Sequence, residues 1–155
     1  MKINFPLLAL VIGAFAIGTT EFSPMGFLPE IAQDLEISIP RAGMLISAYA
    51  LGVMLGAPLM TLWLSRYSKR KSLILLMAIF TLGNILAMLA PSYLSLMGAR
   101  IITSLNHGAF FGIGSVVAAS VVPKDKQASA VAMMFMGLTI ANIGGVPLAT
   151  WIGQN

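Results

Sequence analysis

The sequence predicts an all-α, polytopic membrane protein built as a bundle of transmembrane helices. Hydrophobic residues make up 58% of the 155 residues, and the mean hydropathy is +0.92. Charged residues make up only 9%, whereas soluble domains carry about 25%. The long apolar runs lack the polar/apolar alternation that marks the strands of a membrane β-barrel. Because the chain has no cysteine, a disulfide framework and thiol chemistry are excluded.

The basic residues indicate orientation in a membrane. The formal net charge is +4 and the isoelectric point is about 9.8, but the basic side chains lie mainly in short segments between apolar runs. We therefore expect a lipid bilayer, and no nucleic acid, as the partner of this surface. The apolar run after Lys2 continues past Glu21, which is too long for a cleaved signal peptide, so we expect it to be retained.

The first predicted span covers about residues 5–28. Pro6 suits the first turn of a helix, and Pro24 is expected to kink the outer end. At about 1.5 Å per residue, Glu21 lies about 24 Å from the inner end, in the outer half of a hydrocarbon core about 30 Å thick. The loop of residues 29–41 is mostly acidic and is expected outside the cell; its charged residues are Glu30, Asp34, Glu36 and Arg41.

The second predicted span covers about residues 42–64. Small residues recur at every fourth position, at Ala48, Gly52 and Gly56, and such a stripe allows helices to pack closely. Tyr49 lies beside the stripe. A packing or interfacial role explains it as well as a position in a solute cavity does.

The loop of residues 65–72 carries the clearest topological signal. It is basic without any acidic residue and is therefore predicted to be cytoplasmic; its basic residues are Arg66, Lys69, Arg70 and Lys71. A second basic turn, at residues 123–126, is expected on the same side. The sequence thus predicts a cytoplasmic amino terminus, five spans, and a carboxyl terminus on the opposite side.

Three further spans are predicted at about residues 73–90, 93–121 and 127–151. The fourth span is longer than a bilayer requires, so we expect it to be tilted. The fifth span ends in the segment NIGGVPLATWIG, where two glycines and Pro147 are expected to interrupt the helix.

The fourth span contains a polar segment, RIITSLNHGAFFGIGS, inside an otherwise apolar run. Its polar and small residues recur at helical spacing and share one face: Arg100, Thr103, Ser104, His107, Phe111, Gly114 and Ser115. A guanidinium in hydrocarbon costs at least about 2.5–3.5 kcal/mol, so this face is expected to line the bundle interior or a watery cavity. Glu21 is predicted at a similar depth. The two charges form either a structural ion pair or a switch in which Glu21 carries a proton and pairs with Arg100 in turn.

His107 is the only histidine, and two interpretations stay open for it. In one it titrates or binds a solute, because imidazole changes charge near neutral pH. In the other, which is commoner for a lone intramembrane histidine, it makes an interhelical hydrogen bond to Asn106 or Asn142. The sequence has no second histidine, no Ser/His/Asp arrangement and no phosphate-binding loop, so we expect no metal site, no cofactor and no enzyme.

Four segments, in order, resemble the drug:proton antiporter branch of the major facilitator superfamily, and in particular its bacterial inner-membrane permeases. They are residues 13–32, residues 42–59, RIITSLNHGAFFG and GLTIANIGGVPLATWIG. The resemblance implies a rocking-bundle transporter with two six-span halves, each built from inverted three-span repeats. On that basis the chain supplies the first five spans, as a partial amino-terminal bundle at residues 1–155. The sixth span and the carboxyl-terminal half of the same transporter are absent from it.

The resemblance also implies roles for individual residues. Arg100 matches the fourth-span arginine that is associated with proton coupling, and Glu21 matches the acidic residue of the first-span signature. The fifth-span antiporter motif, expected to act as a hinge and altered here in its usual Gly-Pro order, falls on Gly137, Ala141, Gly144, Gly145 and Pro147. The cytoplasmic loop departs from the superfamily pattern, since Gly, Asp and Gly are usual at the positions of Thr61, Ser65 and Ser68.

Together these features predict a secondary active transporter that exports a small organic solute or drug across the inner membrane in exchange for protons. The candidates for the solute cavity are His107, Asn142, Tyr49 and Asn106. One alternative is a sugar or nucleoside efflux permease, in which the two asparagines bind hydroxyl groups. The other is a truncated membrane protein that packs against other helices and transports nothing.

Overall fold

The computed structural model describes residues 4–154, which fold into helices without any strand. Lys2, whose charge contributes to the predicted orientation, lies outside the described residues. The elements are α1 (Phe5–Gly26), α2 (Leu28–Asp34), α3 (Ile39–Leu64), α4 (Lys69–Met88), α5 (Tyr93–Ser104), α6 (His107–Ser120), the 3₁₀ turn η1 (Lys124–Lys126), α7 (Gln127–Ile140), the π-helical segment η2 (Ala141–Gly145) and α8 (Val146–Gln154).

Five helical stretches in this range are long and apolar enough to cross a membrane. Three are single helices, α1, α3 and α4; α5 with α6 forms the fourth, and the stretch from η1 to α8 forms the fifth. Large apolar side chains cover the outside of the bundle, as the four leucines of α3 at positions 51, 55, 59 and 62 illustrate, each of which is more than half exposed. Such a surface is stable against lipid tails and not against water. The predicted all-α transmembrane bundle is confirmed.

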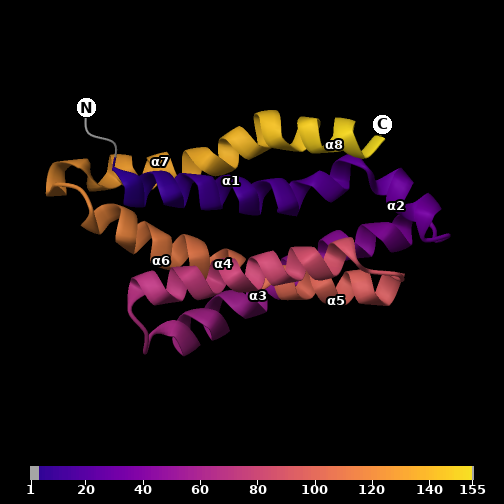
Figure 1. Ribbon diagram of the computed structural model, residues 1–155, viewed down its shortest axis with the longest axis horizontal. Coiled ribbons are helices and arrows are strands. Elements are labelled where there is room, and N and C mark those ends of the chain that lie inside the picture. The colour runs from indigo at the N-terminus through magenta and orange to yellow at the C-terminus, as the bar shows by residue number, and fades with distance from the viewer. Residues whose placement is uncertain (1–3, 155) are drawn as a thin grey trace.

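The helices form two layers, as Figure 1 shows. In one layer α1 lies alongside α7 and α8, and in the other α3 and α4 pack against α5. α6 contacts members of both layers. The start of α1, the α3–α4 loop and the α6–α7 turn lie at one end of the bundle, whereas α2, the α4–α5 loop and the end of α8 lie at the other (Figure 1). The basic loop residues therefore gather at the first end, and the acidic residues of α2 and its following turn gather at the second.

Local signals in the sequence explain where several helices begin. The side chain of Asn4 caps α1 by accepting a hydrogen bond from the Leu7 backbone, and Ser38 caps α3 by accepting one from Arg41. Each of these helices also has a proline in its first turn, where a missing N–H costs nothing. Ser92 and Ser95 cap α5 reciprocally. These caps satisfy backbone donors that would otherwise stay unpaired at the membrane boundary.

The segment predicted as the first exterior loop contains the short helix α2. Pro29 fits its first turn, and the helix ends at Asp34. Glu36 then adopts a positive φ of 51°, which reverses the chain before the cap of α3. The loop expectation missed this helix because its seven residues are too few to show helical periodicity in the sequence.

The fourth span is interrupted after Ser104 and resumes at His107. The hydroxyl of Thr103 donates to the backbone carbonyls of Ala99 and Arg100, and that of Ser104 donates to the carbonyl of Ile101. Such bonds from hydroxyl side chains to preceding carbonyls compete with the helical pattern and bend a helix. The interruption places His107 at the first position of α6.

Two glycines mark close helix crossings. A Cβ atom at Gly52 of α3 would collide with the hydroxyl of Ser104, next to the interruption in the fourth span. A Cβ atom at Gly137 of α7 would collide with the carbonyl oxygen of Val11 and would lie 3.0 Å from the backbone nitrogen of Phe15, both in α1. The stripe at Gly52 therefore seats α5, and Gly137 seats α7 on α1, as small residues do between membrane helices.

The fifth span is loosened without being broken. Residues Ala141–Gly145 form a π-helical turn, and α8 follows it directly with Pro147 in its first turn. Proline has no N–H for the carbonyl four residues earlier, and a π-helical turn is a common way to pass such a position. The expected interruption at Gly144, Gly145 and Pro147 therefore takes the form of a local change in helical pitch.

Candidate functional site

Four polar side chains from four different helices meet inside the bundle. They are Glu21 of α1, Tyr49 of α3, Arg100 of α5 and His107 of α6, and they are called the central cluster below. Tyr49 and Arg100 are almost completely buried, with 2% and 5% of their surfaces exposed. The side chains of Glu21 and His107 are partly accessible, at 23% and 14%. The cluster thus has a buried half and a half that the surroundings can reach.

The Nδ1 atom of His107 is the point at which two neighbours compete. It lies 3.3 Å from the Tyr49 hydroxyl and 3.6 Å from Oε2 of Glu21. Protonated Nδ1 is a donor and attracts the carboxylate, whereas unprotonated Nδ1 is an acceptor for the tyrosine hydroxyl. The protonation and tautomer of the imidazole thus determine whether Nδ1 donates or accepts in these two contacts, which join α6 to α1 and to α3.

Arg100 is held by α1 and by the face of Tyr49. Its Nη1 donates to the backbone carbonyl of Thr20 at 2.9 Å, and its Nη2 donates to that of Glu21 at 3.5 Å. The guanidinium carbon lies 4.5 Å from the centre of the Tyr49 ring, a cation–π contact that is strong in a desolvated site. Nε is buried, with no hydrogen-bond partner among residues 4–154.

The expected ion pair between Glu21 and Arg100 takes a different form in the structure. Within the described range, the carboxylate of Glu21 has its charged contact with His107, and Arg100 reaches only the backbone of Glu21. The depth of the two residues is compatible with a pair. Arg100, however, directs Nη1 and Nη2 to two backbone carbonyls and its cationic face to Tyr49, and the carboxylate contacts the imidazole instead.

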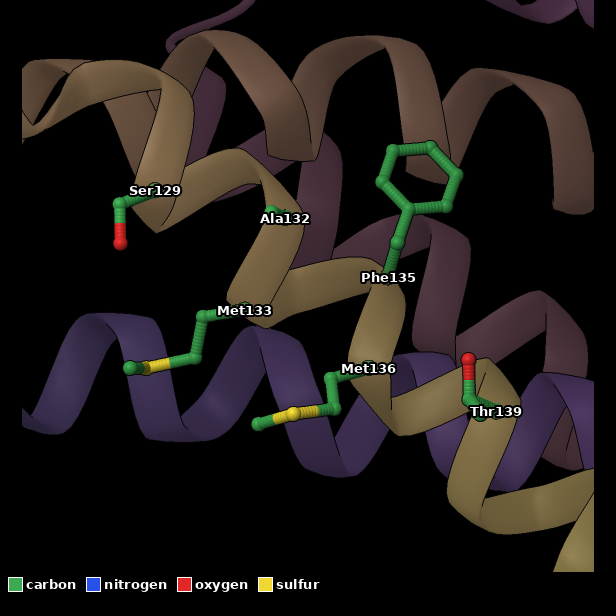
Figure 2. A pocket seen from close by; sticks show the side chains of 6 residues that line it. All are labelled: Ser129, Ala132, Met133, Phe135, Met136 and Thr139. Carbon is green, nitrogen blue, oxygen red and sulfur yellow. The ribbon is translucent and has the colours of Figure 1, made fainter.

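Aromatic rings connect His107 to the surface of α7. The ring of Phe111 lies 5.0 Å from that of His107 and stacks at 5.0 Å on Phe135, which is partly exposed. Phe135 also borders a shallow groove of about 460 Å³ on α7, which Figure 2 shows; its other lining residues are Ser129, Ala132, Met133, Met136 and Thr139. In Figure 2 the two methionines extend to the same side of α7. Phe135 extends to the opposite side of the helix, so the part of the groove that can adapt to apolar solutes of different shape is the pair of flexible thioethers.

Sequence reasoning missed this α7 surface. Its residues recur at positions 129, 132, 133 and 136, a spacing that places them on one face of a helix. The pattern consists of small residues and methionines, which in a membrane helix look the same whether they face lipid, another helix or a solute. Only its continuity with His107 through Phe111 and Phe135 sets the face apart.

The two asparagines named as cavity candidates lie away from the central cluster. Asn106 is fully buried, and its side-chain amide donates to the carbonyl of Leu76 in α4 at 3.4 Å. Asn142 is exposed and donates to the carbonyl of Leu138 in its own helical segment at 3.0 Å. Neither hydrogen-bonds to His107, whose polar partners are Tyr49 and Glu21.

The residues of the antiporter motif divide between two sides of the fifth span. Gly137, Ala141 and Gly145 are buried, and a Cβ atom at Gly145 would lie 2.6 Å from the hydroxyl of Thr19 in α1. Gly144 and Pro147 are exposed. The buried members therefore form the seat for the half of α1 that precedes Glu21.

No group of three His, Cys, Asp or Glu side chains that could hold a metal ion gathers among the residues that the structure describes. The central cluster itself contains one carboxylate, one imidazole and one permanent cation, groups that pair charges and exchange protons.

Comparison with known proteins agrees with this architecture. The chain is 75% identical over 154 residues to the inner membrane transport protein YdhP of Escherichia coli K12, 45% identical over 148 residues to the putative transporter AraJ of the same strain, and 35% identical over 152 residues to a chloramphenicol resistance protein of Streptomyces lividans. These alignments cover 96–99% of the chain but only 38–40% of each relative. Residues 10–155 match the family described as the Major Facilitator Superfamily. The chain belongs to the Major Facilitator Superfamily.

Proposed function

We propose that the chain is the amino-terminal part of a proton-coupled secondary transporter that exports a small organic solute or drug across a bacterial inner membrane. The observation that carries the proposal is the central cluster, in which Nδ1 of His107 is shared between Glu21 and Tyr49. A shared proton site between helices is what coupling requires, because a proton then changes which helices are bonded to each other.

In the proposed cycle, Arg100 is a fixed charge, and Glu21 and His107 carry the proton. With a proton on Nδ1, the imidazole binds the carboxylate and ties α6 to α1. When the proton leaves, Nδ1 accepts a hydrogen bond from the Tyr49 hydroxyl, which links α6 to α3. The two bonded states correspond to two arrangements of the bundle, and the solute selects between them.

The relatives support a transport function and the need for a second half. YdhP is called an inner membrane transport protein, and the Streptomyces relative is called a chloramphenicol resistance protein. Because the chain spans about 40% of the length of YdhP, we propose that a carboxyl-terminal half of the same transporter completes the solute pathway. Rocking of the two halves against each other would expose the pathway alternately to each side.

The distribution of charge supports a cytoplasmic amino terminus. Most of the basic residues lie in the α3–α4 loop, the first turn of α4 and the α6–α7 turn. These segments are at the same end of the bundle as the start of α1. The positive-inside rule assigns that end to the cytoplasm.

Transport by the intact protein in proteoliposomes tests the proposal, with chloramphenicol and tetraphenylphosphonium as probes. We expect Glu21→Gln to abolish uptake driven by a pH gradient while solute exchange without a gradient continues. Glu36→Gln, which alters an exposed carboxylate outside the spans, is the matched control and should behave as wild type. Undiminished gradient-driven uptake in Glu21→Gln would exclude Glu21 as a proton carrier.

The nature of the lining favours an apolar organic solute over a sugar or nucleoside. Asn106 donates to the carbonyl of Leu76 in α4, whereas the exposed α7 surface that Phe111 and Phe135 connect to His107 includes two methionines together with Ser129, Ala132 and Thr139. We therefore expect tetraphenylphosphonium to compete with the transported solute more strongly than glucose or uridine does. Competition by the sugar or the nucleoside alone would favour the alternative.

A further inference from the structure

Pro24 interrupts the hydrogen-bond ladder of α1 at one defined carbonyl. It lies inside the helix, and its nitrogen carries no hydrogen. The carbonyl oxygen of residue i−4, which is Thr20, therefore lacks its regular helical donor. In hydrocarbon a carbonyl without a donor costs several kcal/mol, so another group is expected to bind it.

Arg100 of α5 supplies that group. Its Nη1 lies 2.9 Å from the Thr20 carbonyl oxygen, the shortest hydrogen bond that the guanidinium makes among the described residues. The side chain of Thr20 is also hydrogen-bonded, since its hydroxyl donates to Oδ1 of Asn84 in α4 at 3.3 Å. One residue of α1 thus joins two neighbouring helices, and the bond to Arg100 uses the carbonyl that Pro24 releases.

We infer that Pro24 is a positioning residue for the central cluster: by removing the helical donor of Thr20, it reserves that carbonyl for Arg100. The guanidinium is then anchored to the backbone of α1 and to the ring of Tyr49. Its anchoring leaves the Glu21 carboxylate to His107, which is the contact that the structure shows. A helical N–H at position 24 would compete for the carbonyl and release Arg100 toward the carboxylate.

The anchoring of Arg100 by Pro24 stands independently of transport, because it concerns hydrogen bonds in one state of the bundle. Only its consequence for proton coupling rests on the proposed function. The experiments below therefore measure hydrogen bonding and stability and need no transported solute.

A double-mutant cycle on the thermal unfolding of the intact protein in detergent tests the inference. Arg100→Met removes the donor and leaves the Thr20 carbonyl unsatisfied, so the melting temperature should fall. Adding Pro24→Ala supplies a helical N–H to the same carbonyl. The double variant should therefore melt higher than Arg100→Met alone, by about 2–4 °C, the shift expected for one recovered buried hydrogen bond. In the background that keeps Arg100, Pro24→Ala should give no such gain.

Pro58 provides the matched control, because it interrupts α3 in the same way but lies on an exposed face. Pro58→Ala should change the melting temperature equally with and without Arg100. The inference is overturned if Pro24→Ala has the same effect in both backgrounds. It is also overturned if Pro58→Ala rescues Arg100→Met as well as Pro24→Ala does.

A measurement on the wild-type protein decides the matter if the variants fail to fold. Solid-state NMR with ¹³C-carbonyl threonine and ¹⁵N-guanidinium arginine should show a dipolar coupling between Thr20 and Arg100 that corresponds to about 4 Å. Arg100→Lys, which removes the label, should remove the coupling. A wild-type spectrum without this coupling would overturn the inference.

Discussion

Burial should make the contact between Arg100 and Tyr49 much stronger than a similar contact at the surface. The same pair of residue types occurs twice: Arg100 lies 4.5 Å over Tyr49, and Arg41 lies 4.9 Å over Tyr93. The distances are alike, but Arg100 is 5% exposed, whereas Arg41 is an exposed residue at the start of α3. Cation–π contacts contribute about 0.5–1 kcal/mol at exposed sites and about 2 kcal/mol or more when desolvated.

Two double-mutant cycles compare these contacts. One combines Tyr49→Leu with Arg100→Met, the other Tyr93→Leu with Arg41→Met, and each cycle cancels the loss of ring volume that either tyrosine variant causes on its own. The free energy of unfolding of the intact protein, measured by titration with a denaturing detergent, should give a coupling energy of about 2 kcal/mol for the buried pair and under about 1 kcal/mol for the exposed pair. Equal coupling energies would refute the argument that desolvation strengthens the central cluster.

Three further predictions follow from the packing and the charge distribution. Gly137→Ala should lower the free energy of unfolding by about 1–3 kcal/mol, because the new methyl group meets backbone atoms of α1 that cannot move aside. Gly144 has open space around it, so Gly144→Ala should change that free energy by no more than about 0.5 kcal/mol. Equal effects of the two variants in thermal unfolding would contradict the packing. Asn106→Leu should be neutral or stabilising, since it removes a buried side-chain carbonyl oxygen that has no hydrogen-bond partner within residues 4–154, along with one long hydrogen bond. A fall in transport without a fall in stability would instead indicate that Asn106 binds solute. Single cysteines at Ser68 and Ser38 should react with a membrane-impermeant maleimide from opposite sides, the first only from the cytoplasm, and labelling of Ser68→Cys in intact cells would reverse the proposed orientation.

The sequence sufficed for the fold because lipid constrains it strongly. Each apolar run must form its backbone hydrogen bonds internally, which only a helix allows within a single segment. The low charge content indicates that lipid surrounds these runs. The interruption at residues 105–106 could not be predicted from the sequence, since it depends on side-chain hydroxyl groups. Such groups bend a helix only where contacts with a neighbouring helix fix their position. Gly52, which lets α3 approach Ser104 directly, shows that such a neighbour is present.

The members of the central cluster were predictable, but the way they bond to one another was not. Counting residues along a helix gives the depth of a side chain, and depth placed Glu21 and Arg100 together. The partner that each takes depends on how the helices are rotated about their axes. Pro24 adds a factor that composition does not reveal, because it creates an acceptor in the backbone that draws the guanidinium away from the carboxylate.

The central cluster can form only late in the synthesis of the chain. The contact of Arg100 with the backbone of Glu21 joins residues 79 positions apart, and at about 5–20 residues per second a ribosome needs roughly 4–16 s to make the intervening chain. Throughout that interval α1 carries a carboxyl group and a free backbone carbonyl whose partners have not yet been made. These polar groups of α1 are therefore paired only after the fourth span is made, and a pause in translation between the two spans would prolong the time for which they stay unpaired.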